Sequence, residues 1–229
     1  MDPNSSQWNE RHQALRKALA RPDALLNAID LFLVQHAPLH APGVSGTQGW
    51  NLEEEVWTDL GEETFRCVPP GEEHSIAWCY WHLARIEDIT MNLLVAGSDQ
   101  VFTQADWQQR LHAPFADTGN LISPEDVLAL SQQVEINTLR EYRSAVGLRT
   151  RQIVQQLNPA DIKRKTPSER LQRGLDEGAI APYATGLIKY WGGLTVAGLL
   201  LMPPTRHNLF HLSECLTLKR KAQKSLRSK

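Results

Sequence analysis

The chain has 229 residues, of which 41% are hydrophobic and 22% charged, and its formal net charge at pH 7 is −2. This composition excludes a collagen-like or disordered chain, and the small net charge gives no general attraction to nucleic acid or to an anionic membrane. The length suits one domain over residues 1–229, with a bundle core from about residue 20 to 224 and a basic tail at 225–229.

The first 21 residues are polar and of mixed charge, so they lack the apolar core of a signal peptide. A first helix is predicted from about Pro22 to Gln35, because apolar residues recur there at steps of three and four. A loop rich in proline and glycine follows at 38–49, and the acidic stretch 51–64 is predicted to hold a short turn of helix.

Two longer helices are predicted in the middle of the chain. One runs from about 71 to 96 and ends at Gly97, a residue that commonly stops a helix. The other runs from about 124 to 157, and Ser123 with an acid three residues later forms its cap.

The last third of the chain is interrupted more often. Residues 160–182 are charged and irregular, and a helix is predicted at about 184–191, before the break at Gly192-Gly193. The apolar run 194–202 has about half the roughly 20 residues that a membrane-spanning helix needs. A last helix is predicted from Pro203 or Pro204 to about residue 224, and together these elements indicate an all-α, antiparallel four-helix bundle with extra short helices in long connections.

His207 and His211 are the strongest chemical signal in the sequence. Residues four apart on a helix lie on one face, so both imidazoles can bind the same ion. The segment is not the HExxH signature of zinc proteases, because Asn208 follows the first histidine.

His82 provides a third candidate ligand. It lies on the apolar stripe of the 71–96 helix, where a neutral imidazole needs a hydrogen-bond partner or a metal. A single histidine of this kind is more often a hydrogen-bonded core residue. Combined with His207 and His211 on another long helix, it favours a metal site, because bundles build such sites from facing helices. Three protein ligands leave positions open for water or substrate, as in catalytic sites.

The segments SIAWCYWHLARIEDITMNLL and LLLMPPTRHNLFHLSECLTLKRK resemble the DinB/YfiT-like superfamily, over about residues 20–220. The resemblance implies a helical bundle in which His82, His207 and His211 bind one divalent ion, Zn or Ni first and Mn or Fe as alternatives. A Gln or Glu often follows the last histidine of the family by three residues, and Glu214 occupies that place. The connections at 38–70 and 158–185 are longer than in the shortest members and would change the pocket.

The resemblance further implies a thiol-dependent S-transferase or isomerase in detoxification or stress response, since characterised relatives use mycothiol, bacillithiol or glutathione. A bound divalent ion lowers the pKa of water or of a low-molecular-weight thiol. Glu214 is the candidate proton acceptor or imidazole-orienting group, with a solvent-facing glutamate as the alternative. Arg206 is the candidate contact to an anionic group of cofactor or substrate, with a surface salt bridge as the alternative. The competing function is a non-catalytic metal-binding or ligand-binding bundle.

The remaining features point to few partners beyond a small-molecule substrate. The cysteines, Cys67, Cys79 and Cys215, form no CxxC pair and favour a reduced, cytoplasmic setting, although Cys79 or Cys215 could approach the ion. The cations of the tail suit a helix C-terminus and have no aromatic residues between them, so nucleic-acid binding is not expected. Trp78, Trp81 and Trp191 are expected in the core or around a pocket, and the seven tryptophans favour a homodimer.

Overall fold

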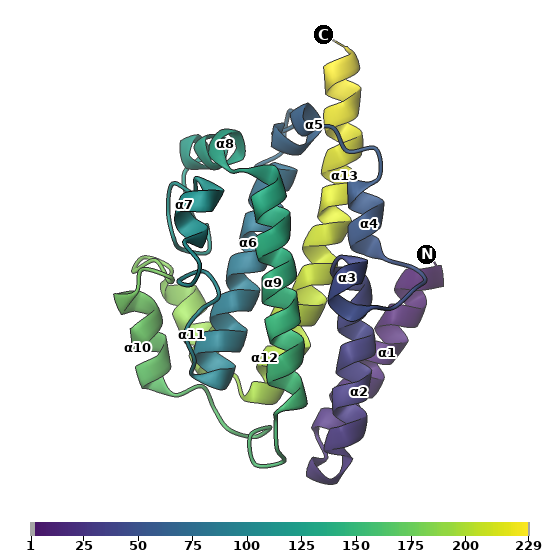
Figure 1. Ribbon diagram of the computed structural model, residues 1–229, viewed down its shortest axis with the longest axis vertical. Coiled ribbons are helices and arrows are strands. Elements are labelled where there is room, and N and C mark those ends of the chain that lie inside the picture. Colours follow the sequence, from purple (N-terminus) through teal and green to yellow (C-terminus); the bar gives the residue numbers. More distant parts are fainter. Residues whose placement is uncertain (1–2, 229) are drawn as a thin grey trace.

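The computed structural model describes residues 3–228, apart from the side chains of Pro3 and Pro22. Over this range the chain is helical and contains no strand. The long helices run side by side along the long axis of the molecule, with shorter helices around them (Figure 1). The predicted all-α bundle is therefore confirmed.

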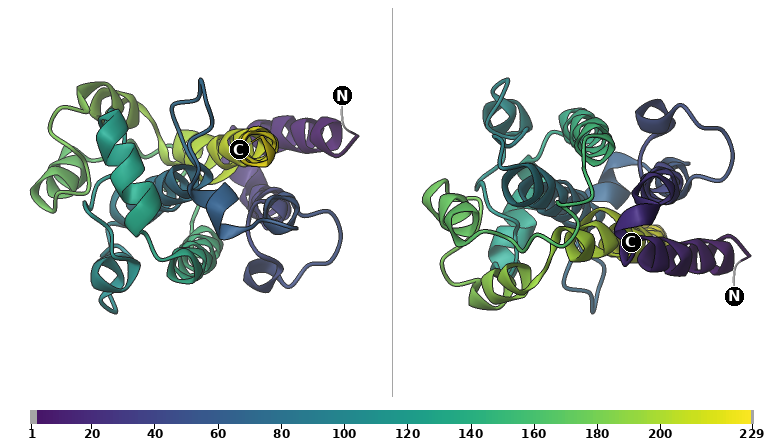
Figure 2. Two further views of the ribbon diagram at one scale, coloured as in Figure 1. Left: turned by 90° about the horizontal axis from the view of Figure 1, so that it is seen from above. Right: turned by 90° about the horizontal axis from the view of Figure 1, so that it is seen from below.

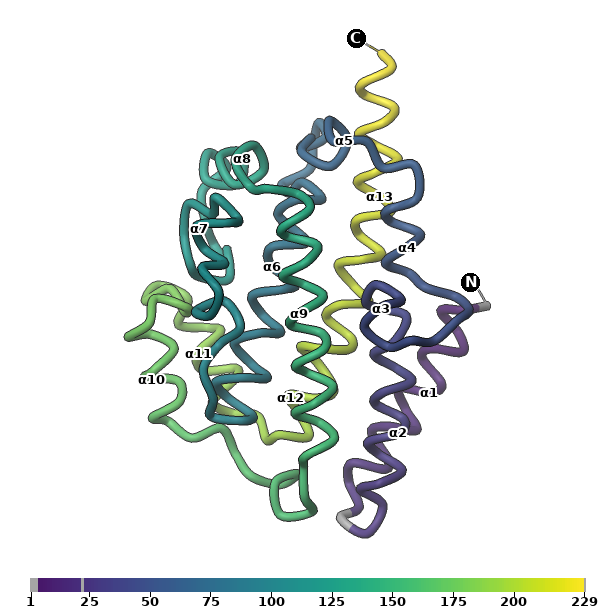
Figure 3. Tube along the Cα trace, in the orientation of Figure 1, coloured from purple at the N-terminus to yellow at the C-terminus, as the bar shows by residue number. Residues whose placement is uncertain are grey.

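Four helices form the bundle: α2 (Leu25–His36), α6 (Ile76–Asp88) with its continuation η3 (Ile89–Ala96), α9 (Ile136–Gln155), and α13 (Asn208–Arg227). In Figure 1, α2 and α13 run upward, whereas α6 and α9 run downward. The chain can be traced along the tube of Figure 3, where the stretch between η3 and α9 returns to the top of the bundle. Both members of the α6–α9 pair therefore start at the same end of the bundle.

Short helices occupy the connections, as predicted. They are η1 (Pro22–Ala24), η2 (Ala37–Leu39), α3 (Pro42–Ser45), α4 (Leu52–Trp57), α5 (Glu62–Arg66), α7 (Trp107–Leu111), α8 (Pro124–Gln133), α10 (Ser168–Asp176), α11 (Thr185–Gly193), α12 (Val196–Leu201) and the π-helical turn η4 (Met202–His207). None of the helices in the described part of the chain is long and apolar enough to cross a membrane.

The N-terminal helix α1 (Pro3–Leu19) was not expected from the sequence. It packs on α2 and buries Trp8, Leu15 and Leu19, which recur at helical spacing among charged residues. The indole N–H of Trp8 donates to the carbonyl of Gln35 at 3.2 Å, and the Gln35 amide donates to the carbonyl of Trp8 at 3.0 Å. These reciprocal bonds fix α1 to the C-terminal end of α2.

Two of the predicted helix boundaries differ in the structure. The helix expected from residue 71 starts at Ile76, where the Ser75 hydroxyl caps it by accepting the backbone N–H of Trp78 at 2.9 Å. The helix expected over 124–157 is divided at Val134, and Glu135 caps the second part by accepting the backbone N–H of Thr138 at 2.6 Å. Gly97 ends η3 with a φ of 73°, as expected for a glycine stop.

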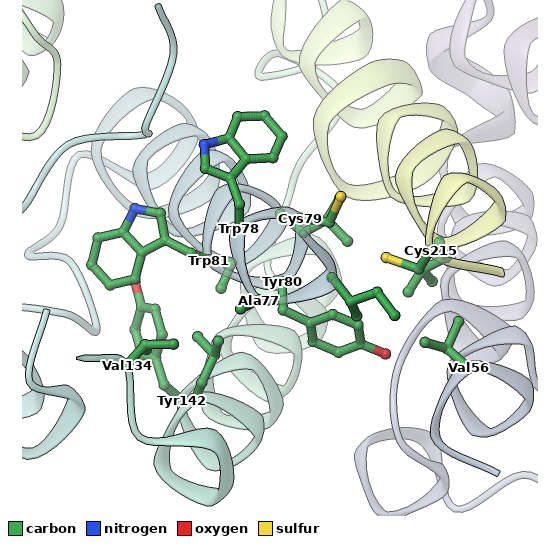
Figure 4. Close-up of a cluster of buried hydrophobic side chains, with 14 of the residues drawn as sticks. Val56, Ala77, Trp78, Cys79, Tyr80, Trp81, Val134, Tyr142 and Cys215 are labelled. Atoms are coloured by element: carbon green, nitrogen blue, oxygen red, sulfur yellow. The ribbon is translucent and has the colours of Figure 1, made fainter. Parts of the chain in front are cut away.

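Helix α6 is the centre of the molecule. All of its residues are buried, and in the end-on views of Figure 2 other helices lie around it. Trp78, Tyr80 and Trp81 project from it into the core, and Tyr142 reaches this cluster from α9 (Figure 4). A polar side chain on α6 consequently has to find its partner inside the protein.

Candidate metal centre

The three predicted histidines converge inside the bundle. One ring nitrogen of each of His82, His207 and His211 lies within 4.8 Å of the others. The ring centroids are 4.9 Å apart for His82 and His207, 5.0 Å for His82 and His211, and 4.6 Å for His207 and His211. Helix α6 therefore presents one imidazole to the two that come from η4 and the first turn of α13.

The tautomer of His82 is fixed by the backbone. Its Nδ1 lies 2.7 Å from the carbonyl oxygen of Thr118, which can only accept a hydrogen bond, so Nδ1 carries the proton. Burial, followed by the neighbouring His211, lowers the pKa of His82 to about 3, so the ring is neutral at pH 7. The lone pair is consequently on Nε2, which faces Nε2 of His207 at 3.1 Å.

His211 is oriented by Glu214, one turn further along α13. Its Nδ1 donates to the carboxylate at 2.6 Å, which leaves Nε2 free. Burial alone would raise the pKa of Glu214, but the hydrogen bonds from His211 and His74 outweigh it and lower that pKa to about 2. Glu214 thus contacts His211 and also His74, at 3.4 Å, a contact that was not foreseen, and its role in orienting an imidazole stays a prediction.

His207 lies at the end of η4, where Pro203 and Pro204 interrupt regular helical hydrogen bonding. Burial, together with His82 and His211, holds its pKa well below the usual value, so this imidazole is also neutral. Its Nδ1 is buried and has no hydrogen-bond partner.

The donor set fits a divalent ion. Neutral imidazoles are good ligands for first-row divalent metals, and two nitrogens bound tetrahedrally at about 2.0–2.1 Å lie about 3.3 Å apart. The 3.1 Å separation of the Nε2 atoms of His82 and His207 is close to this value. The backbone carbonyl behind His82 and the carboxylate behind His211 are the kind of second contacts that orient metal-binding histidines.

One cavity adjoins the triad, and a second lies nearby. A small one of about 70 Å³ is lined by both His82 and His207, together with Asn120, Tyr190, Trp191 and Met202. A larger one of about 710 Å³ is lined by His74 and Trp78 and also reaches Asn120. Trp78 lies between two imidazoles, with ring centroids 3.6 Å from His74 and 4.6 Å from His82. The larger cavity is thus separated from the histidines by Trp78 and Asn120.

The two cysteines near the site lie between α6 and α13. Cys79 and Cys215 are fully buried and face each other (Figure 4). Burial is the main cause that raises the pKa of Cys79 well above the usual value, and the hydrogen bond with Cys215 adds to it. The thiol of Cys79 is therefore protonated. Cys79 is nevertheless within 4.8 Å of a ligand atom of both His211 and Glu214, which keeps it beside the candidate site.

A second buried histidine cluster lies deeper in the bundle. His36 and His40 place their Nε2 atoms 2.9 and 3.0 Å from the two carboxylate oxygens of Glu87, and all three side chains are fully buried. Asn208 adds a third N–H to the same carboxylate, at 2.6 Å. Burial would raise the pKa of Glu87, but its histidine partners reverse this and keep it ionised. We interpret the cluster as a hydrogen-bonded anchor, because every contact pairs a donor with a carboxylate oxygen.

The chain was also compared with known proteins. The family model of the DinB superfamily matches residues 46–183, more than half of the chain. This match contains His82 and ends before His207 and His211, so the complete triad is seen only in the structure. A search of curated proteins gave no match.

Proposed function

Because the chain belongs to the DinB superfamily, we propose that it binds one divalent metal ion through His82, His207 and His211 and uses that ion in catalysis. The observation that carries this proposal is the convergence of the three imidazoles, of which His82 and His211 are each held by a hydrogen bond through Nδ1, which leaves Nε2 available to an ion.

An enzyme is favoured over a structural metal site by the number of ligands and by the space beside them. Three histidines leave at least one coordination position for water or substrate. The cavity lined by His82 and His207 gives that position room for a small group. A fourth ligand from Cys79 would close the site and support the competing function, a non-catalytic metal-binding bundle.

The reaction we propose is the transfer or addition of a low-molecular-weight thiol to a small-molecule substrate. A bound divalent ion with an open position would lower the pKa of the thiol and make it a nucleophile at neutral pH. Around it, Glu214 keeps His211 in the Nε2-binding tautomer and the Thr118 carbonyl does the same for His82. Trp78 stacks on the ring of His82, and Trp191 lines the small cavity beside His82 and His207.

Metal content tests the first part of this proposal. Untagged protein should carry about one equivalent of Zn, Ni, Mn or Fe by inductively coupled plasma mass spectrometry, and His207→Ala/His211→Ala should carry none. His112→Asn is the matched control, because His112 is exposed, lies away from the triad and has a φ of 53° that asparagine tolerates. Wild-type protein that neither carries metal nor takes up added ions would refute the proposal.

Cobalt-loaded protein tests the open position. Adding a small thiol should produce a thiolate-to-cobalt charge-transfer absorption if a coordination position is free. An unchanged spectrum would indicate a closed site and favour the non-catalytic bundle.

The homodimer expected from the sequence stays a prediction, which sedimentation analysis would test.

A further inference from the structure

A third cavity, of about 840 Å³, lies on the outer side of α12 and has a basic lining. Its cations are Arg16 and Lys17 at the end of α1, and Arg206 on η4. Helix α12 lies between α1 and α11 in the view from below (Figure 2), so the cavity brings together parts of the chain far apart in sequence. No acidic residue is among the side chains that line it.

None of the three cations is paired with a carboxylate among the described residues. Among the described residues, Arg16 and Lys17 form no ion pair, and Arg206 makes a single long contact, 3.4 Å, with the side-chain oxygen of Asn9. Most other arginines of the chain are engaged by a carboxylate or a carbonyl, as Arg143 and Arg173 are. Three like charges around one cavity repel one another, and a bound anion would relieve that repulsion.

His12 supplies a further polar group in the same cavity. It is 7% exposed, and its Nδ1 is buried with no hydrogen-bond partner. The ring is stacked on Trp8 at a centroid distance of 4.9 Å, which holds it in place. A buried polar atom without a partner is uncommon and is often satisfied by a bound group or water.

This basic cavity adjoins the small cavity of the candidate metal centre. Tyr190 and Met202 line both the basic cavity and the small cavity beside His82 and His207. Arg206 and His207 are consecutive residues, so their Cα atoms are about 3.8 Å apart. One small molecule could therefore contact the arginine with one end and the histidines with the other.

We propose that the basic cavity binds the anionic end, a carboxylate or phosphate, of the small molecule that reacts at the histidine triad. The planar guanidinium group of arginine matches a carboxylate or phosphate in shape and charge. A cavity of this volume is typical for small ligands. The position of the reacting end rests on the proposed function. Anion binding itself requires only Arg16, Lys17 and Arg206.

Isothermal titration calorimetry with malonate and with inorganic phosphate tests anion binding. Arg206→Gln and Arg16→Gln/Lys17→Gln should each weaken binding at least about tenfold, because a hydrogen bond to a charged group contributes about 1.5–3 kcal/mol. Lys224→Gln is the matched control, since it removes one exposed cation of α13 that does not line the cavity. Preference for malonate over phosphate would identify a carboxylate, and the reverse preference a phosphate. Absence of binding to both would refute the proposal.

The same titration with His207→Ala/His211→Ala separates this inference from the metal proposal. Anion binding should persist in that variant. Binding that disappears with the histidines and survives neutralisation of the arginines would place the anion on the metal and overturn the inference. Wild-type protein without metal that still binds malonate through Arg206 would refute only the metal proposal.

A bifunctional probe tests the connection between the two cavities. In cobalt-loaded protein, the charge-transfer absorption should appear at a concentration of mercaptosuccinate at least about tenfold lower than that of neutral mercaptoethanol. Arg206→Gln should remove this advantage, whereas Lys224→Gln should retain it. Equal concentrations in wild-type protein would show that the cavities do not bind one ligand together.

Discussion

The side-chain amide of Asn208 donates to Glu87 at 2.6 Å, one residue after the candidate ligand His207. The buried His36–His40–Glu87 cluster is thereby joined to the start of α13, the helix that also carries His211. The turn that carries His207 is thus held by a carboxylate deep inside the bundle. This contact gives the polar side chain of Asn208, between His207 and His211, a partner inside the protein.

Asn208→Ala should lower the metal affinity about 10- to 100-fold, as the loss of contacts behind metal ligands commonly does. It should also destabilise the fold by about 1–3 kcal/mol, because Glu87 loses a buried donor. Competition with a chelator gives the affinity, and urea unfolding gives the stability. Asn137→Ala, on the exposed side of α9, is the control and should change neither. An Asn208→Ala protein with wild-type affinity would show that His207 is positioned independently of Glu87.

Glu214→Gln is expected to weaken metal binding while leaving the fold intact. The glutamine oxygen can still accept from Nδ1 of His211, but the charge that favours this tautomer and increases the basicity of Nε2 is lost. We expect a decrease in affinity of about tenfold by chelator competition. Glu125→Gln is the matched control, because it makes the same exchange at an exposed position on α8. If both variants bind metal equally well, the charge of Glu214 has no influence on metal binding.

The triad could be predicted because its spacing is local. His207 and His211 are one helical turn apart and so share one face, and His82 interrupts an apolar stripe, which places it on an inward face; the resemblance to the DinB/YfiT-like superfamily joined the three. The groups that orient them were not predictable in the same way. The Thr118 carbonyl belongs to an irregular connection, and such a backbone group leaves no residue-type signal.

Other features were missed for different physical reasons. His36 and His40 are also four residues apart, but Pro38 between them argues against a helix, and their partner Glu87 lies about 50 residues away. Helix α1 was missed because the charged residues around Trp8 and Leu15 dilute its narrow apolar face. The basic cavity depends on α1, so it could not be foreseen from Arg206 alone.

The free energy of unfolding should fall below pH 6.5, in part through His12. Burial, followed by the nearby charges of Arg206 and Arg16, lowers the pKa of His12 from 6.5 to about 4 in the fold. The unfolded chain therefore binds more protons between pH 4 and 6.5, so the stabilisation is complete above this window and is lost as the pH decreases through it.

Urea unfolding of wild type and His12→Gln between pH 7.5 and 4.5 measures this contribution. The other buried histidines titrate in both proteins. The difference between wild type and His12→Gln in the change of unfolding free energy with pH therefore isolates the contribution of His12. One proton changes the free energy by at most about 1.4 kcal/mol per pH unit, and solvent screening reduces this value. Parallel pH profiles would contradict the depressed pKa of His12.

Gly147→Ala on α9 should destabilise the protein, although alanine is the better helix former. An added Cβ would lie 2.6 Å from Nδ1 of His40, whose buried ring is bonded to Glu87 and cannot move aside. Overpacking of this kind costs about 1–3 kcal/mol, whereas alanine in a helix gains about 1 kcal/mol over glycine. Gly186→Ala on α11, where the Cβ would meet nothing within 4 Å, is the control and should be neutral or stabilising in urea unfolding. If Gly147→Ala were equally well tolerated, the His40 ring would have room to shift, and the packing around the His36–His40–Glu87 cluster would be looser than the structure shows.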